Sequence, residues 1–131
     1  MSTSTIRQTF EMALAEITPA IDTAYVGDDF EPVVDVPYQE VTFFFIEPDN
    51  AYVHQKFIQL GYMQVALLYP IMTGTAAISN RAEAIRSKFR SGSTFSGITI
   101  NKTPDIQEAK KDGDRLRKNV FVPFSEIITE A

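Results

Sequence analysis

The sequence predicts an α+β domain in which a largely antiparallel sheet of about five strands carries two main helices packed on one face. Two segments have apolar residues at helical spacings of three and four. Other segments alternate between apolar and polar residues, or are continuously apolar, and turn sequences separate them. These strand-like segments are residues 38–46, 61–69, 95–100 and 116–124. A length of 131 residues suits one core, so we expect residues 1–131 to form a single domain.

The first helix is expected to begin at Ser4 or Thr5, since either side chain can cap a helix N-terminus. It should end near Pro19, because the residue before a proline avoids the helical conformation. Its apolar stripe consists of Ile6, Phe10, Leu14 and Ile17. A stripe of this width predicts a helix that packs one face against a sheet.

An irregular acidic segment is expected at residues 24–37, where glycine and proline interrupt any regular pattern. The neighbouring carboxylates of Asp28 and Asp29 could suit a hard cation. Their spacing matches no calcium-binding loop, which favours a solvated loop or a contact with another subunit. Asp28, Asp29 and Glu31 are therefore candidate interface residues.

The central unit consists of residues 61–69, a Pro70 break and a second helix. The strand is apolar on both pleat faces, which is typical of a strand in the middle of a sheet. Pro70 and the Thr73-Gly74-Thr75 turn should end it. The apolar stripe of the helix that follows consists of Ile78, Ala82, Ile85 and Phe89.

The second face of the sheet also carries apolar side chains. They are Phe44, Ile46, Tyr62, Leu68 and Phe121. Two helices can cover one face of such a sheet, whereas monomers rarely leave a large contiguous apolar patch open to water. A neighbouring subunit is the expected cover, and Phe44 is a candidate contact residue.

The last part of the chain predicts further strands. Residues 105–111 form a polar, edge-like extended piece, and Asp112-Gly113-Asp114 contains a strong hairpin dipeptide. The final strand is expected to end near Phe124, followed by a polar tail.

Charge is unevenly distributed along the chain. The net charge is −5, yet residues 1–60 hold ten acidic and two basic residues, whereas residues 61–131 hold seven and ten. The second helix contributes Arg81, Arg86 and Arg90. This basic face could be solvated, contact the acidic half of another subunit, or contact nucleic acid. Since no nucleic-acid-reading motif accompanies it, direct DNA binding is disfavoured.

Signs of catalysis or cofactor binding are missing from the sequence. There is no cysteine, and neither a GxGxxG nor a GxxxxGK[ST] pattern occurs. His54 is the single histidine and has no nucleophile motif near it, so a hydrolase that uses His54 as a base is the weakest hypothesis. No secretory signal is evident, and no apolar run is long enough for a membrane helix. We therefore expect a non-enzymatic protein without cofactor, small-molecule substrate or membrane partner.

The order of core and turn residues resembles that of siphophage tail-completion proteins of the lambda-type tail-terminator kind. The matching positions are Gly61, Gln64, Val65, Tyr69, Pro70, Gly74, residues 81–86, Phe89, Gly92, Pro104, Val120, Val122, Pro123 and Phe124. The resemblance implies a hexameric ring that caps the tail tube, stops its polymerisation and contacts the head–tail connector protein. Its partners would be further copies of itself, the tail tube protein and the connector. It would lie at the head–tail junction of the virion, and in the host cytoplasm during assembly.

Two alternatives remain open at this point. The first is a different neck or head-completion protein, and the second is a nucleic-acid-binding accessory domain that uses the second helix.

Overall fold

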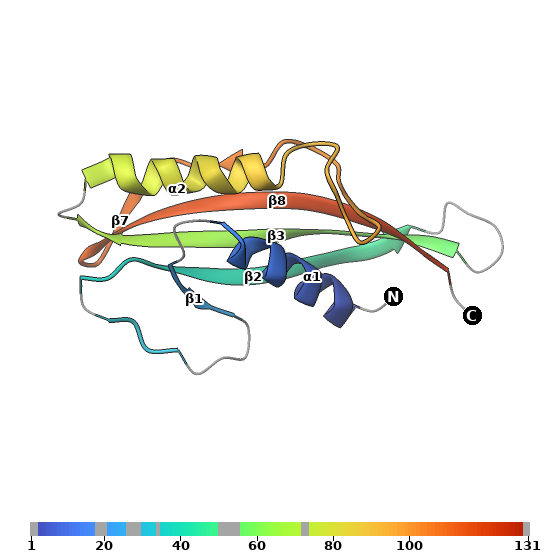
Figure 1. Ribbon diagram of the computed structural model, residues 1–131, viewed down its shortest axis with the longest axis horizontal. Helices are drawn as coiled ribbons and strands as arrows, with labels where there is room; N and C mark the ends of the chain where they lie inside the picture. Colours follow the sequence, from blue (N-terminus) through green and yellow to red (C-terminus); the bar gives the residue numbers. More distant parts are fainter. Residues whose placement is uncertain are drawn as a thin grey trace.

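A computed structural model describes most of the chain (Figure 1). The described residues are 3–17, 21–25, 30–33, 35–49, 56–71 and 74–129. The elements are α1 (Thr3–Ala15), β1 (Asp22–Ala24), β2 (Tyr38–Asp49), β3 (Lys56–Pro70), α2 (Gly74–Lys88), β4 (Thr94–Phe95), β5 (Ile98–Ile100), β6 (Asp105–Ile106), β7 (Lys110–Asp112) and β8 (Arg115–Thr129). The α+β class agrees with the prediction. His54 lies outside the described residues.

Within the described residues, the strands form one eight-stranded sheet in the order β1-β2-β3-β8-β5-β4, with β6 and β7 also paired to β8. Strand β3 is central and pairs with β8 over its whole length. Strand β1 runs parallel to β2, whereas the other pairs are antiparallel. The prediction of about five largely antiparallel strands was therefore wrong in size. The sheet is larger because the free edge of the long β8 accepts three short strands in succession.

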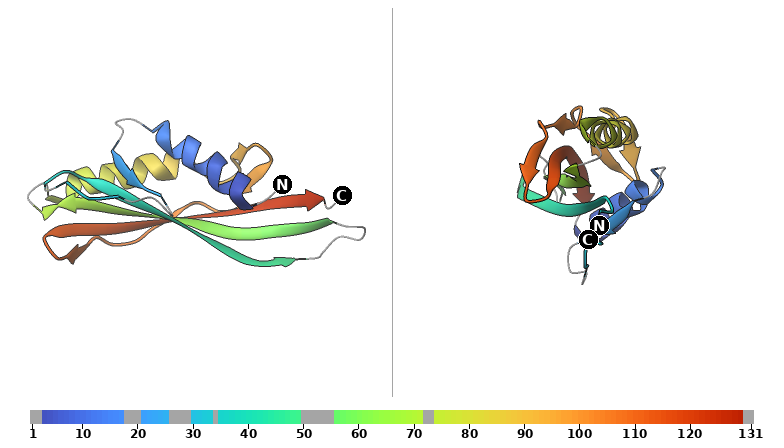
Figure 2. Two further views of the ribbon diagram at one scale, coloured as in Figure 1. Left: turned by 90° about the horizontal axis from the view of Figure 1, so that it is seen from below. Right: turned by 90° about the vertical axis from the view of Figure 1, so that its left-hand side faces the viewer.

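Both helices lie on the same side of the twisted sheet (Figure 2, left). The predicted stripes of α1 and α2 face inward, and every residue named for them is at most 7% exposed. Phe10 is at the centre of this core. Its ring lies 5.1 Å from that of Phe124 and 5.5 Å from that of Phe89, both in edge-on contacts. Such aromatic contacts add to the stabilisation that comes from area burial alone.

Two predicted strands differ in the structure. Residues 95–100 form the β4–β5 hairpin rather than one strand, because Ser96 and Gly97 both have positive φ angles (50° and 88°) and reverse the chain. Strand β8 does not end at Phe124. It continues to Thr129, because β3 begins at Lys56 and supplies pairing partners along this extension. The predicted Asp112-Gly113-Asp114 turn joins β7 to β8, with Gly113 at φ 65°.

Candidate subunit interface

The face of the sheet away from the helices, which we call the outer face, exposes apolar side chains. Phe44 of β2, Tyr62 of β3 and Pro123 of β8 lie in register across three strands. The outer-face patch consists of Phe44, Ile46, Tyr62, Phe121, Pro123 and Ile127. Ile127, Ile46 and Phe44 remain 56%, 49% and 39% exposed. This confirms the predicted apolar character of the second face near Phe44.

Ring contacts fix the shape of this patch. Phe44 stacks on Tyr62 with ring centroids 4.8 Å apart, and Tyr62 meets the edge of Phe121 at 5.7 Å. A shallow groove of about 370 Å³ adjoins these rings. It is lined by Tyr62, Phe121, Pro123, Lys102, Thr103 and Asp105. The groove thus combines an apolar floor with two groups of opposite charge, which is suitable for contact with a protein surface.

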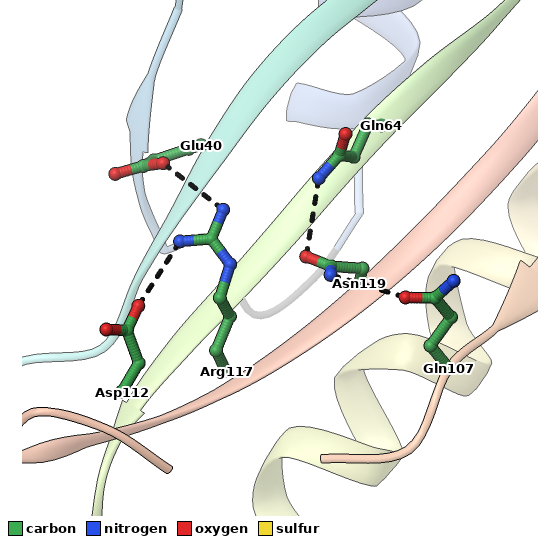
Figure 3. Close-up of polar contacts among 6 residues, drawn as sticks. All are labelled: Glu40, Gln64, Gln107, Asp112, Arg117 and Asn119. Carbon is green, nitrogen blue, oxygen red and sulfur yellow. Dashed lines mark hydrogen bonds and ion pairs between the residues drawn. The ribbon is translucent and has the colours of Figure 1, made fainter. Parts of the chain in front are cut away.

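Beside this patch, the outer face carries a group of polar side chains (Figure 3). Arg117 lies 3.4 Å from Asp112 and 3.9 Å from Glu40. Asn119 accepts a 3.5 Å hydrogen bond from Gln64 and donates one of 3.4 Å to Gln107. These contacts connect β2, β3, β7 and β8 with the segment after β6. Because the ion pairs are partly exposed, we expect each to contribute at most about 1 kcal/mol to stability.

Leu68 is the exception to the predicted exposure of the second face. It is 4% exposed and forms a small cluster with Tyr38 and Ala66, against which Phe30 packs. The segment before β2 therefore covers this end of the outer face. A cover of this kind was not predictable from strand periodicity.

The three arginines predicted for the interface lie in different environments. Arg81 is 5% exposed and lies in the interior. Burial lowers the pKa of its guanidinium below the usual arginine value, and nearby Tyr69 opposes this only in part. Arg86 is half-buried, and its Nε donates a 3.2 Å hydrogen bond to the carbonyl of Pro104. Arg90, just beyond α2, is exposed. Of the three, Arg90 is the most accessible to a partner.

The predicted acidic residues are only partly described. Glu31 is exposed, whereas Asp28 and Asp29 lie outside the described residues. Figure 1 shows α2 along one long side of the sheet, and β1 with the segment leading into β2 along the opposite side. Among the described residues, Glu31 forms no ion pair with Arg86 or Arg90. This arrangement is compatible with a head-to-tail contact between copies.

In the described part of the chain, no group of three His, Asp or Glu side chains has the arrangement of a metal site. Neither described helix is long and apolar enough to cross a membrane.

Ile127 is the interface candidate that the sequence interpretation missed. It was assigned to a polar tail after Phe124, yet β8 carries it onto the outer face opposite Ile58. The alternation of Ser125, Glu126 and Ile127 was the available signal, but three residues are too few to predict a strand.

An α+β domain with a contiguous exposed apolar face belongs to a class of proteins whose surface is suitable for contact with other proteins. A family model described as phage tail terminator protein matches residues 5–124, and the chain belongs to this family. It is therefore a structural protein of the phage tail.

A solved structure supports the fold independently. It is similar over 100% of this chain and 99% of its own, with a TM-score of 0.74 and 18% sequence identity, and its name states no function. At this identity the similarity concerns the fold alone. No curated protein sequence matches the chain.

Proposed function

We propose that this protein forms a closed ring, with six copies as the expected number, that caps the tail tube, stops its polymerisation and joins it to the head connector. The family match supports a role in tail assembly. The exposed outer-face patch is the main observation in favour of ring formation. Ring closure requires two different surfaces on each subunit, related by a rotation.

The outer-face patch is the proposed first surface. Phe44, Ile46 and Ile127 are each more than a third exposed, and they adjoin three partly exposed apolar residues. Covering such a contiguous patch with a neighbouring subunit removes apolar area from water, at roughly 25 cal/mol per Å². Phe44 and Tyr62 are stacked on each other and so lose little side-chain freedom when a neighbour covers them.

Charged residues provide the proposed orientation of the contact. Arg90, with Arg86 beside it, would face the acidic Asp28, Asp29 and Glu31 of the next copy. Complementary charges of this kind set the register and the rate of association more than its strength. Arg81 contributes differently, because from the interior it supports the packing of α2.

The two faces of the ring would bind the tail tube protein and the head–tail connector protein. This places the protein at the head–tail junction of the virion, and in the host cytoplasm while tails assemble. The proposed work is mechanical and non-enzymatic, and it uses no cofactor or small-molecule substrate.

Polymerisation of the tail tube protein encoded by the same genome tests this function. Tubes are grown with and without this protein, and their lengths are measured by electron microscopy. The proposal predicts shorter tubes that carry density at one end. The variant Ile46→Lys should lose this effect. The variant Ile71→Lys, which changes an isoleucine that is 39% exposed and lies just after β3, should keep it. Equal tube lengths with and without the wild-type protein would contradict the proposal.

A further inference from the structure

Arg115 connects the start of β8 to the segment before β2. Its Nη1 donates a hydrogen bond to the carbonyl of Val36, and its Nη2 donates one to the carbonyl of Val33, both at 2.8 Å. Its guanidinium carbon lies 4.8 Å from the centre of the Tyr38 ring. One side chain therefore contacts this segment twice and the first residue of β2 once, about 80 positions earlier in the chain.

The segment itself, described at residues 30–33 and 35–37, has few other attachments. Val33 and Val36 are 55% and 37% exposed, so their side chains do not anchor it. Its hydrogen bond from the Val36 amide to the Val33 carbonyl, 3.2 Å long, is internal to the segment. Asp35 has a φ of 62°, in the left-handed region that Asp adopts more readily than most residues with a side chain.

Phe30 is the second attachment. Its ring centre lies 5.3 Å from that of Tyr38, and the side chain covers the cluster of Tyr38, Ala66 and Leu68. In the described residues, the segment is thus held to the outer face by Phe30 at one end and by Arg115 at the other.

We propose that this segment is a strap that Arg115 latches, and that it opens locally while the sheet stays folded. Opening uncovers Tyr38 and Leu68, which are 8% and 4% exposed in the closed state. These residues lie in register on β2 and β3, the strands that carry Phe44 and Tyr62 of the outer-face patch. The strap therefore limits how much apolar surface the outer face offers. Its effect on assembly rests on the proposed function, whereas its latching does not.

Arginine is suited to this role for a physical reason. Its planar guanidinium can donate to two carbonyl groups while stacking on an aromatic ring, and it stays charged at any physiological pH. Arg117 is a matched control, because it lies two residues further along β8 and on the same face. It pairs with Asp112 and Glu40 and forms no hydrogen bond or ion pair with the described residues of the strap.

Hydrogen exchange of the Val36 amide, followed by NMR in dilute full-length protein, tests the latch. Arg115→Ala should speed this exchange about tenfold or more, since it removes two charge-assisted hydrogen bonds. Arg117→Ala should leave it unchanged, and exchange of the Val65 amide in central β3 should stay slow in both variants. Phe30→Ala, which removes the other attachment, should also speed Val36 exchange.

Two results would overturn the latch. One is an unchanged exchange rate of the Val36 amide in Arg115→Ala. The other is an equal increase in the exchange rate of the Val65 amide, which would mean that the whole domain is destabilised. The effect on assembly is measured separately by sedimentation. There, Arg115→Ala should associate several-fold more tightly than Arg117→Ala, and equal association would overturn the link to assembly. If no variant or wild-type protein associates at all, the ring proposal fails while the exchange result still decides the latch.

Discussion

Gly61 on β3 lies directly opposite Phe124 on β8, and the two pack so closely that no side chain fits between them. A Cβ atom built on Gly61 would lie 2.8 Å from Cζ of Phe124 and 2.5 Å from the carbonyl oxygen of Phe44. Phe124 is fully buried and contacts Phe10 in the core. Gly61 is therefore required by the close approach of a ring and a neighbouring strand.

Replacing Gly61 by alanine should destabilise the fold. The added methyl group must displace either the Phe124 ring or the β2 backbone, and overpacking of this kind costs about 1–3 kcal/mol. Thermal unfolding followed by circular dichroism measures the effect. Thr42→Ala, at an exposed position of β2, is the control and should shift the midpoint little. A Gly61→Ala midpoint equal to that of the wild type would show that the strands can separate without cost.

Phe10 should be among the most sensitive core positions. Truncating this buried side chain to alanine leaves a cavity between α1, α2 and the sheet, with an expected loss of about 3–5 kcal/mol. Met12→Ala on the same helix is the matched control, because Met12 is 65% exposed. Chemical denaturation should separate the two variants clearly. Similar losses for both would contradict the packing described for α1.

Glu126 should make stability depend on pH. It is 4% exposed, its Oε2 has no hydrogen-bond partner among the described residues, and burial raises its pKa. The folded state therefore holds this proton to a higher pH than the unfolded state does. Stability is then lost as pH rises from the ordinary glutamate pKa through the raised one.

The variant Glu126→Gln removes this titration. It should be more stable than the wild type at neutral pH by about 1 kcal/mol, and the difference should vanish below the ordinary glutamate pKa. Unfolding midpoints measured across the acidic range test this, with Glu47→Gln at an exposed position as the control. A pH-independent difference between Glu126→Gln and the wild type would show that the carboxylate charge is not responsible.

Reversing the charge of Arg90 should weaken self-association at low salt, since this exposed cation is proposed to face acidic residues of the next copy. The effect should fade as ionic strength rises, because salt screens exposed charges. Light scattering across a salt series measures it, with Lys110→Glu on β7 as the control. Arg86→Glu is a less clean probe, because Arg86 also bonds Pro104 and pairs with Glu83 at 3.5 Å within the subunit. An Arg90→Glu variant that associates like the wild type at every salt concentration would remove Arg90 from the interface.

The spacing of apolar residues predicted those helices and strands that are long enough to show it over several turns or pleats. Ile78, Ala82 and Ile85 of α2 are fully buried, as their spacing indicated. The long apolar strands β2 and β3 were also predicted, as segments 38–46 and 61–69. Strands of two residues, such as β4 and β6, carry too few positions for a pattern, and they depend on pairing with β5 and β8, respectively.

The candidate site was harder to predict, because exposure depends on tertiary packing. Arg81 was placed on a solvent-facing basic surface, yet its long side chain is buried beside Tyr69, where its aliphatic stem can pack. Leu68 was expected on an open face, but a segment with no periodic signal covers it. Phe44 was predicted correctly as an exposed apolar residue, since its strand pairs and alternates regularly.

The oligomeric mass of the purified protein, measured by sedimentation equilibrium over a range of concentrations, shows whether the subunits form a closed ring. We expect a single closed oligomer of several subunits. Ile46→Lys should convert it to monomer and Ile71→Lys should leave it intact, both with near-normal unfolding midpoints. A wild-type protein that stays monomeric at high concentration and low salt would contradict ring formation.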